Sequence, residues 1–319
     1  MVAKGIGVLV LHEGADQYLE ELHRRFPAVE FRVVREPAGL AAARGFPAAI
    51  AYSCVTDGFP RTEHARLRDW PGLDWVHVGG SGFDHFVADG PPGFLLTNGA
   101  GVLAQELAQT LLGALLALNR GFVGALRDQD AGRWRPWSFA ALGGQTLVIV
   151  GTGAIGTAFA ALAKALGLRV IGVARTAAPK PPFDRVVPLA DLASIAAEAD
   201  YLSINVRLTE ATRHLIDAAL LDAMRPSAFL LNASRGAVVD EAALIRALDE
   251  RRLAGAYLDV FETEPLPESS PFRRLDNVLI TPHCSDRVAD WELRHARFFM
   301  ANLERRLAGQ ELLNRVAGD

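Results

Sequence analysis

Residues 147–156 read Leu-Val-Ile-Val-Gly-Thr-Gly-Ala-Ile-Gly, and this segment indicates the fold of the second half of the chain. The apolar run predicts a buried strand, and Gly151, Gly153 and Gly156 follow it in the spacing Gly-x-Gly-x-x-Gly. The first glycine permits a tight turn, the second lets the backbone approach a pyrophosphate, and the third lets the next helix pack closely on the strand. Because a helical segment through Leu166 follows, the pattern predicts a dinucleotide-binding turn whose N–H groups bind a pyrophosphate.

The second half of the chain alternates apolar strands with helical segments around this turn. The runs that predict strands lie at residues 147–150, 169–173, 201–206, 228–232, 256–260 and 278–280. Six strands with helices between them are typical of a doubly wound, nucleotide-binding Rossmann domain.

The first hundred residues alternate in the same way, with strands expected at residues 7–11, 29–34, 48–52, 75–78 and 94–97. The fold class is therefore α/β, with two doubly wound parallel-sheet domains: a flavodoxin-like substrate domain and the Rossmann cofactor domain. A last helix, residues 288–308, is expected to return to the first domain. We predict a discontinuous substrate-binding domain at 1–98 and 289–319, a dinucleotide-binding domain at 99–288, and an active site in the cleft between them.

A long apolar helix is predicted from about Val102 to Gly121. Its leucines recur at intervals of three and four residues, and further leucines and alanines fill its other faces. Such a helix is buried on more than one side. It is either a central core helix or a surface that binds a second copy of the chain.

Composition narrows the class of protein. The 319 residues are half hydrophobic and 22% charged, with 33 Lys plus Arg against 37 Asp plus Glu. Without a basic stripe we expect no nucleic-acid partner, and without an apolar run of membrane-spanning length we expect no membrane partner. Cys54 and Cys284 lie far apart and in no metal-ligand spacing, so we expect no bound metal and a reducing, cytoplasmic location.

The end of the second strand of the Rossmann domain bears on the choice of dinucleotide. An NAD enzyme normally places Asp or Glu there to accept a hydrogen bond from the ribose 2′-OH. This chain has Ala174-Arg175-Thr176 instead, with Lys180 close behind. Since Arg pairs with a 2′-phosphate and Thr hydrogen-bonds it, we predict NADP(H) in preference to NAD(H). The alternative is that Arg175 is a solvated surface residue and that backbone contacts choose the cofactor.

Three residues downstream of the glycine turn suggest the chemistry. Arg235 stands in Asn-Ala-Ser-Arg-Gly, Glu264 in Phe-Glu-Thr-Glu-Pro and His283 in Thr-Pro-His. A fixed cation can hold a substrate carboxylate, an imidazole can protonate a new alkoxide, and a carboxylate can keep that imidazole charged. Together with a nucleotide cradle, these groups predict hydride transfer to a 2-oxo acid.

These motifs, in this order, resemble those of the D-isomer-specific 2-hydroxyacid dehydrogenases over nearly the whole chain. The matching pieces are Gly-Ser-Gly-Phe-Asp at 80–84, Thr-Asn at 97–98 with Gly-Val-Leu at 101–103, the glycine turn, Leu-Thr at 208–209, Asn-Ala-Ser-Arg-Gly at 232–236, Asp-Val-Phe at 259–261 with Glu-Pro-Leu at 264–266, and Thr-Pro-His at 281–283. Within the family the chain is similar to the shorter glyoxylate and hydroxypyruvate reductase-like members. The resemblance implies a homodimer that reduces a small 2-oxo acid to a D-2-hydroxy acid.

The resemblance also implies roles for single residues at the substrate. Ser81 and Gly82 would offer backbone N–H groups to the substrate carboxylate, and Arg235 would contact both the carboxylate and the keto oxygen. His283 would act as general acid in reduction and as general base in oxidation, with Glu264 as its partner.

The cofactor would be held by residues of the second domain. Asp259 would lie near the nicotinamide carboxamide. The full set expected to contact the cofactor is Gly151, Gly153, Ala154, Ile155, Gly156, Arg175, Thr176, Val206, Thr212, Ala233, Asp259 and His283.

Three residues depart from the family pattern or lack a clear role, and each has two interpretations. Arg207 lines the cofactor pocket or lies at the surface. Trp137 either lines the substrate pocket, where it could be contributed by a partner subunit, or packs at the domain junction. Cys284, directly after His283, is a redox-active thiol or a small buried filler. For the whole protein, the alternative is a dinucleotide-binding, corepressor-like scaffold or redox sensor without turnover.

Overall fold

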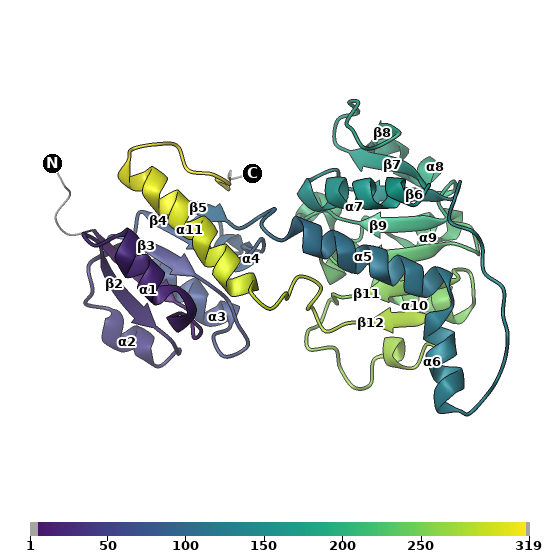
Figure 1. Ribbon diagram of the computed structural model, residues 1–319, viewed down its shortest axis with the longest axis horizontal. Coiled ribbons are helices and arrows are strands. Elements are labelled where there is room, and N and C mark those ends of the chain that lie inside the picture. The colour runs from purple at the N-terminus through teal and green to yellow at the C-terminus, as the bar shows by residue number, and fades with distance from the viewer. Residues whose placement is uncertain (1–5, 317–319) are drawn as a thin grey trace. The chain divides into compact units, whose positions relative to one another are not determined.

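The computed structural model describes residues 6–316 of the chain. The chain divides into two compact units, one comprising residues 1–103 and 288–319 and the other residues 104–287 (Figure 1). Each unit is built on one sheet in which every neighbouring pair of strands is parallel. The α/β class with two parallel-sheet domains is therefore confirmed.

A five-stranded sheet forms the centre of the first unit, in the order β2-β1-β3-β4-β5. The strands are β1 (Gly7–Leu11), β2 (Glu30–Val34), β3 (Ala48–Ser53), β4 (Trp75–Val78) and β5 (Leu95–Asn98). This order is the flavodoxin-like one that the sequence predicts. The carboxyl ends of β4 and β5 lead directly into the segments that contain Ser81 and Gly99.

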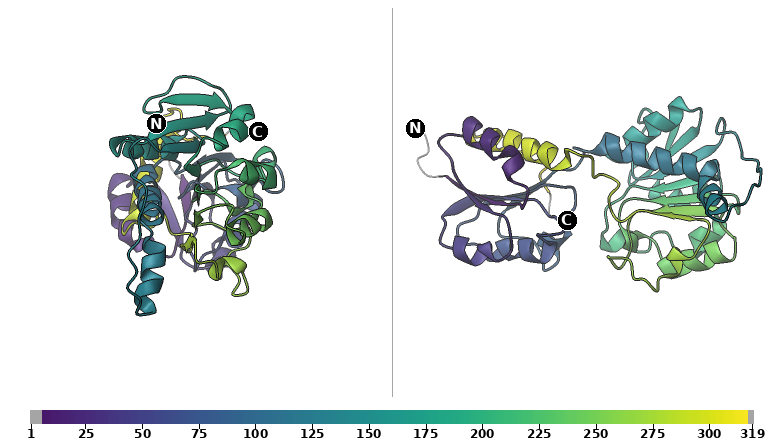
Figure 2. Two further views of the ribbon diagram at one scale, coloured as in Figure 1. Left: turned by 90° about the vertical axis from the view of Figure 1, so that its right-hand side faces the viewer. Right: turned by 60° about the horizontal axis from the view of Figure 1, so that its bottom comes forward.

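Two helical layers cover the first sheet. On one face α1 (Asp16–Arg25) lies beside α11 (Trp291–Leu307), as Figure 2 shows, and both pack on Val8 and Val10. The other face carries α2 (Gly39–Ala43), α3 (Arg61–His64), the 3-10 helix η1 (Ala65–Asp69) and α4 (Asp84–Val87). Leu9 and Leu11 belong to that second face, because successive side chains of a strand point to opposite sides.

The second unit is built on a seven-stranded sheet in the order β12-β11-β10-β9-β6-β7-β8. The strands are β6 (Thr146–Val150), β7 (Arg169–Ala174), β8 (Arg185–Pro188), β9 (Tyr201–Ile204), β10 (Phe229–Asn232), β11 (Gly255–Leu258) and β12 (Val278–Ile280). Counted from β6, the order is the Rossmann order with one strand added at the end.

The prediction of six strands for this unit was wrong by one, because it missed β8. This strand has four residues, Arg-Val-Val-Pro, and ends in a proline. It pairs only with β7 and forms the edge of the sheet. An edge position tolerates the proline. Because the proline ends the strand after two valines, the apolar run is too short to be recognised in the sequence.

Helices cover both faces of the second sheet as well. One face carries α5 (Ala104–Asn119) and α7 (Ala154–Ala165). The other carries α8 (Leu192–Ala196), α9 (Ala218–Ala223) and α10 (Glu241–Asp249). Short 3-10 helices punctuate the loops: η2 (Leu189–Asp191), η3 (Glu210–Thr212), η4 (Gly236–Val238) and η5 (Pro271–Arg273).

The long apolar helix of the sequence, α5, is a core helix of this unit. Its side chains at Leu107, Leu111, Leu115 and Leu118 are buried, and the last three belong to the core shared with α7 and the sheet. A separate helix, α6 (Phe122–Asp130), follows it and was not distinguished in the sequence. In residues 6–316 no single helix is both long and apolar enough to span a membrane, and α5 with α6 passes that test only as a pair bent by 64°.

Candidate active site

The glycine turn lies between β6 and α7, and each glycine has its own structural reason. Gly151 has φ 104°, a left-handed conformation, and a Cβ there would collide with the carbonyl of Asn205. A Cβ at Gly156 would collide with the carbonyl of Gly151. Gly153 caps the start of α7, and a Cβ there would meet open space. The open helix N-terminus fits a pyrophosphate, because its N–H groups and positive dipole end attract an anion.

Cationic side chains stand beside this turn. Arg175 and Thr176 follow the end of β7 and are exposed. Lys180 folds back so that its ammonium donates to the carbonyl of Thr152, inside the glycine turn. In the sequence Lys180 is only a near neighbour of Arg175, whereas in the structure it contacts the glycine turn.

His283 and Glu264 form a close pair. Nδ1 of His283 lies 2.7 Å from Oε2 of Glu264, and the backbone N–H of Phe261 donates to Oε1 of Glu264 at 3.0 Å. The two side chains are 34% and 33% exposed, so the pair is open to solvent or substrate without lying on a flat surface. The pairing inferred from the sequence is therefore present in the structure.

Asp259 organises the loop that presents His283. Its side chain is fully buried and accepts hydrogen bonds from the Thr281 hydroxyl at 2.5 Å, from the N–H groups of Cys284 and Ser285 at 3.0 and 3.2 Å, and from the Ser285 hydroxyl. The Asp259 carbonyl also accepts the N–H of His283 at 2.8 Å. His283 itself has φ 50°, and these bonds fix that uncommon conformation. Motif reasoning placed Asp259 at the nicotinamide and missed this role, because the partners follow it by more than 20 residues.

Arg235 is positioned by the residue that ends β10. The Asn232 side chain accepts from the N–H and hydroxyl of Ser234 at 3.0 and 2.9 Å and donates to the Arg235 carbonyl at 3.0 Å. Gly236 packs against the backbone of Phe261, so that no Cβ fits there. Arg235 and the loop that carries Glu264 are therefore neighbours within the second unit.

The remaining predicted cofactor residues differ in their surroundings. Val206 is half-buried, and its side chain lies against the position that a Cβ of Gly151 would occupy. Ala233 is also half-buried. Thr212 is committed to the turn before it: its hydroxyl accepts from the N–H of Thr209 at 2.7 Å and donates to the carbonyl of Arg207 at 2.8 Å. Arg207 is exposed.

Trp137 packs on the corner between α5 and α6. Its indole N–H donates to the carbonyl of Arg120 at 2.8 Å, and its ring lies where a Cβ of Gly121 would go. The side chain remains half exposed. Trp137 is therefore held within the second unit by this corner.

Neither cysteine has the lowered pKa that an activated thiol requires. Burial raises the pKa of Cys54 to about 12, and burial together with the negative charge of Asp259 raises the pKa of Cys284. Because the thiolate is the reactive form, a raised pKa argues against a redox role for either. A redox sensor that works through either thiol is therefore not favoured.

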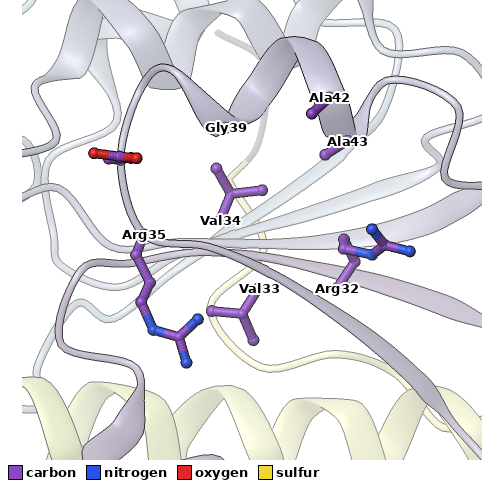
Figure 3. A pocket seen from close by; sticks show the side chains of 8 residues that line it. Arg32, Val33, Val34, Arg35, Gly39, Ala42 and Ala43 are labelled. Atoms are coloured by element: carbon purple, nitrogen blue, oxygen red, sulfur yellow. The ribbon is translucent and has the colours of Figure 1, made fainter.

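Neither a metal centre nor a surface hollow adds to this candidate site within the described residues. Within residues 6–316 no group of His, Cys, Asp and Glu side chains is arranged to hold a metal ion. A shallow hollow of about 560 Å³ lies in the first unit between β2 and α2 (Figure 3). Its lining consists of Arg32, Val33, Val34, Arg35, Glu36, Gly39, Ala42 and Ala43. Its lining contains none of the predicted site residues, and Arg35 is already paired with Asp16 at 2.5 Å.

Comparison with known proteins identifies the family of this chain. The model of the D-isomer specific 2-hydroxyacid dehydrogenase NAD binding domain matches residues 112–285. The chain is 31% identical over 318 residues to a glyoxylate/hydroxypyruvate reductase A of Arabidopsis thaliana, which covers 98% of this chain and 99% of the relative.

Solved structures are similar over the same length. A D-isomer specific 2-hydroxyacid dehydrogenase family protein from Aeromonas salmonicida has 29% identity and a TM-score of 0.87, covering 98% of this chain and 99% of the other. An NADPH-dependent glyoxylate/hydroxypyruvate reductase from Sinorhizobium meliloti, in complex with NADP and sulfate, has 26% identity and a TM-score of 0.83, covering 98% of each chain. The protein is therefore a dinucleotide-dependent oxidoreductase that belongs to the D-isomer-specific 2-hydroxyacid dehydrogenase family.

Proposed function

We propose that this enzyme reduces small 2-oxo acids, such as glyoxylate and hydroxypyruvate, to D-2-hydroxy acids and that it prefers NADPH to NADH. The observation that carries the proposal is the 2.7 Å pair of His283 and Glu264 in the same unit as the glycine turn. The relatives named as glyoxylate/hydroxypyruvate reductases, one of them NADPH-dependent, support the substrate class and the cofactor.

The residues of the second unit would divide the chemistry as follows. Arg235 binds the substrate carboxylate and polarises the keto oxygen. Protonated His283 donates a proton from Nε2 to that oxygen as the alkoxide forms, while Glu264 stabilises the imidazolium through Nδ1. A bound reduced nicotinamide would supply the hydride. In the reverse reaction, neutral His283 accepts the hydroxyl proton of the D-2-hydroxy acid.

The cofactor would be bound by the glycine turn and the residues around it. Gly151, Gly153, Ala154, Ile155 and Gly156 present the N-terminus of α7 to the pyrophosphate. Arg175, Thr176 and Lys180 would contact the 2′-phosphate, for which they supply positive charge and a hydroxyl. Val206 and Ala233 would contact the cofactor directly, and Thr212 and Asp259 would shape the pocket from behind.

For the first unit we propose a substrate-binding role, with the domain comprising residues 1–98 and 289–319. Ser81 and Gly82 would donate their backbone N–H groups to the substrate carboxylate. Ser81 is exposed and Gly82 half-buried, so both are open to a ligand.

The proposal is tested by following the oxidation of NADPH and NADH with a panel of 2-oxo acids. The panel contains glyoxylate, hydroxypyruvate, pyruvate and phenylpyruvate, and ranks the substrates by size. We expect turnover, with NADPH preferred, and a large loss of kcat/KM in Arg235→Ala. Cofactor binding without turnover on any of these acids would instead favour a scaffold.

We also propose that two copies associate through the surface of α6 and the segment after it. Five large apolar side chains are exposed there: Phe122 54%, Leu126 60%, Trp134 97%, Trp137 50% and Phe139 52%. Large apolar patches on a protein surface mark interaction sites. Analytical ultracentrifugation should give a dimer for the wild type and a monomer for Leu126→Glu; a wild-type monomer would contradict the proposal.

A cytoplasmic location is part of the same proposal. Cys54 and Cys284 are both free thiols. Free thiols persist in a reducing compartment. Thiol titration of the freshly purified, denatured protein should find both reduced.

A further inference from the structure

A turn at residues 98–100 holds the loop that contains Ser81 and Gly82. The backbone N–H of Gly99 donates to the carbonyl of Gly80 at 2.8 Å. The Asn98 side-chain amide donates to the carbonyl of Ser81, also at 2.8 Å. Two successive carbonyls of the loop therefore point toward this turn.

The direction of these carbonyls fixes the direction of two N–H groups. In a planar trans peptide, the C=O and N–H of one peptide unit point to opposite sides. Because the carbonyls of Gly80 and Ser81 point toward the turn, the N–H groups of Ser81 and Gly82 point away from it. Successive N–H groups directed to one side form a concave anion site of the kind that suits a carboxylate.

The turn is held in its own place by the C-terminal segment. Nδ2 of Asn314 donates to the carbonyls of Asn98 at 3.2 Å and Ala100 at 2.7 Å, and the Asn314 carbonyl accepts the N–H of Asn98 at 3.2 Å. Asn314 has φ 51°, in the left-handed region that asparagine adopts more readily than most residues. This conformation lets its backbone and side chain contact the same turn.

A third asparagine fixes the C-terminal segment to α11. Asn302 is fully buried in that helix, donates to the carbonyl of Leu313 at 3.0 Å and accepts its N–H at 2.8 Å. The N–H of Val316 donates to the carbonyl of Leu96 at 2.9 Å, so the segment also runs along β5. Hydrogen bonds thus connect the middle of α11 to the loop after β4.

We propose that Asn98 and Asn314 are positioning residues that aim the N–H groups of Ser81 and Gly82 at the substrate carboxylate. Asn314 sets the turn, and Asn98 sets the peptide between Ser81 and Gly82. The inference rests on the proposed function, because it takes those two N–H groups as the carboxylate site. Both asparagines act through the loop.

Asn314→Gly tests the link, because glycine adopts a positive φ without strain while removing the side-chain donor. We expect KM for glyoxylate and the inhibition constant of oxamate, an unreactive carboxylate analogue, to rise together by about three- to tenfold. The value of kcat and the Kd for NADPH should stay within about twofold. Asn98→Ala should act in the same way, and the double variant should lose less than the product of the two effects.

Arg315→Ala is the matched control from the same segment. Its exposed side chain pairs only weakly with Glu311, at 3.8 Å, and its contact with Thr97 is a backbone bridge. KM and kcat of this variant should equal those of the wild type. A control that matched Asn314→Gly in KM would show a general effect of altering the segment and would overturn the proposal.

Amide hydrogen exchange measures how well the loop at residues 79–84 is held in place, and it does not require catalytic turnover. In Asn314→Gly, residues 79–84 should exchange faster than in the wild type, and the core strand β1 should not. Unchanged exchange with unchanged KM would overturn the proposal, and so would a loss of NADPH affinity as large as the rise in KM. A wild type that reduces no 2-oxo acid would overturn the carboxylate role with the proposed function, while faster exchange would still uphold the link between Asn314 and the loop.

Discussion

Nδ1 of His283 lies 2.7 Å from Oε2 of Glu264, while Oε1 of the same carboxylate accepts the backbone N–H of Phe261. Both carboxylate oxygens are therefore engaged, one by the imidazole and one by the loop that carries the carboxylate. With Nδ1 committed to Glu264, Nε2 is the nitrogen left to exchange a proton with a substrate.

Glu264→Gln should shift the pH profile of reduction to lower pH. Reduction needs the imidazolium, and removing the neighbouring negative charge makes that form harder to keep. The pH above which kcat/KM for glyoxylate falls should therefore decrease. The oxidation reaction, which needs the neutral imidazole, should move in the same direction and become active at lower pH. Profiles that superimpose on those of the wild type would remove Glu264 from this role.

Asp259→Asn should lower kcat and the melting temperature together. The buried carboxylate accepts four hydrogen bonds from residues 281–285. The NH2 group of asparagine would face two of these donors and could not accept their hydrogen bonds. An unsatisfied buried donor costs about 1–3 kcal/mol. The control is Tyr257→Phe, which removes only the 2.9 Å contact of the Tyr257 hydroxyl with Thr281. Equal effects of the two variants on kcat would contradict the special role of Asp259.

Arg175→Ala should weaken NADPH binding by about tenfold or more and leave NADH binding nearly unchanged. The lost interaction is a charge-assisted contact with a 2′-phosphate, which NADH lacks. Lys164→Ala is the control, since that lysine lies on α7 and pairs with Asp184 at 2.5 Å. The Kd values can be measured by the fluorescence of the bound reduced nucleotide. Similar losses for both nucleotides would show that Arg175 does not contact the 2′-phosphate.

The first unit should lose stability in acid before the second. Burial lowers the pKa of His64 and His77 to about 3, and of His85 and His295 to about 4. In the unfolded chain these imidazoles titrate near pH 6.5, so the unfolded state binds more protons below that pH. The free energy of unfolding should therefore fall as the pH decreases from about 6.5 to 4.

Urea unfolding at pH 7.5 and 5, followed by hydrogen exchange of each unit, measures this effect. His77→Gln removes one titrating group and should flatten the pH dependence for the first unit. His23→Gln, on the exposed surface of α1, is the control. A first unit as stable at pH 5 as at pH 7.5 would contradict the prediction.

The sequence was sufficient for the features that depend on local patterns. The alternation of strand-like and helical segments predicted both parallel sheets, and the glycine spacing predicted the start of α7. The edge strand β8 escaped because Arg185–Pro188 offers only two apolar residues to the sheet before its proline. Sequence motifs named His283 and Glu264, but only the structure shows which imidazole nitrogen faces the carboxylate.

Features that depend on distant partners were not predictable. Asp259 acts on residues 281–285 through a fold that brings the ends of β11 and β12 together. Asn98 and Asn314 are 216 residues apart, and no sequence motif predicts that they are in contact. Such pairs carry no periodicity, so their roles are visible only after the sheet and its helices are in place.

The first unit is built from two segments that flank the second unit in the sequence, so its two parts leave the ribosome at different times. Strands β1 to β5 are synthesised before residues 104–287, whereas α11, which covers Val8 and Val10 together with α1, is synthesised after them. Residues 104–287 form a continuous stretch that can close its own core in the meantime. A nascent chain stalled before residue 288 should therefore display a half-covered apolar sheet, and it is at this stage of synthesis that chaperones would bind it.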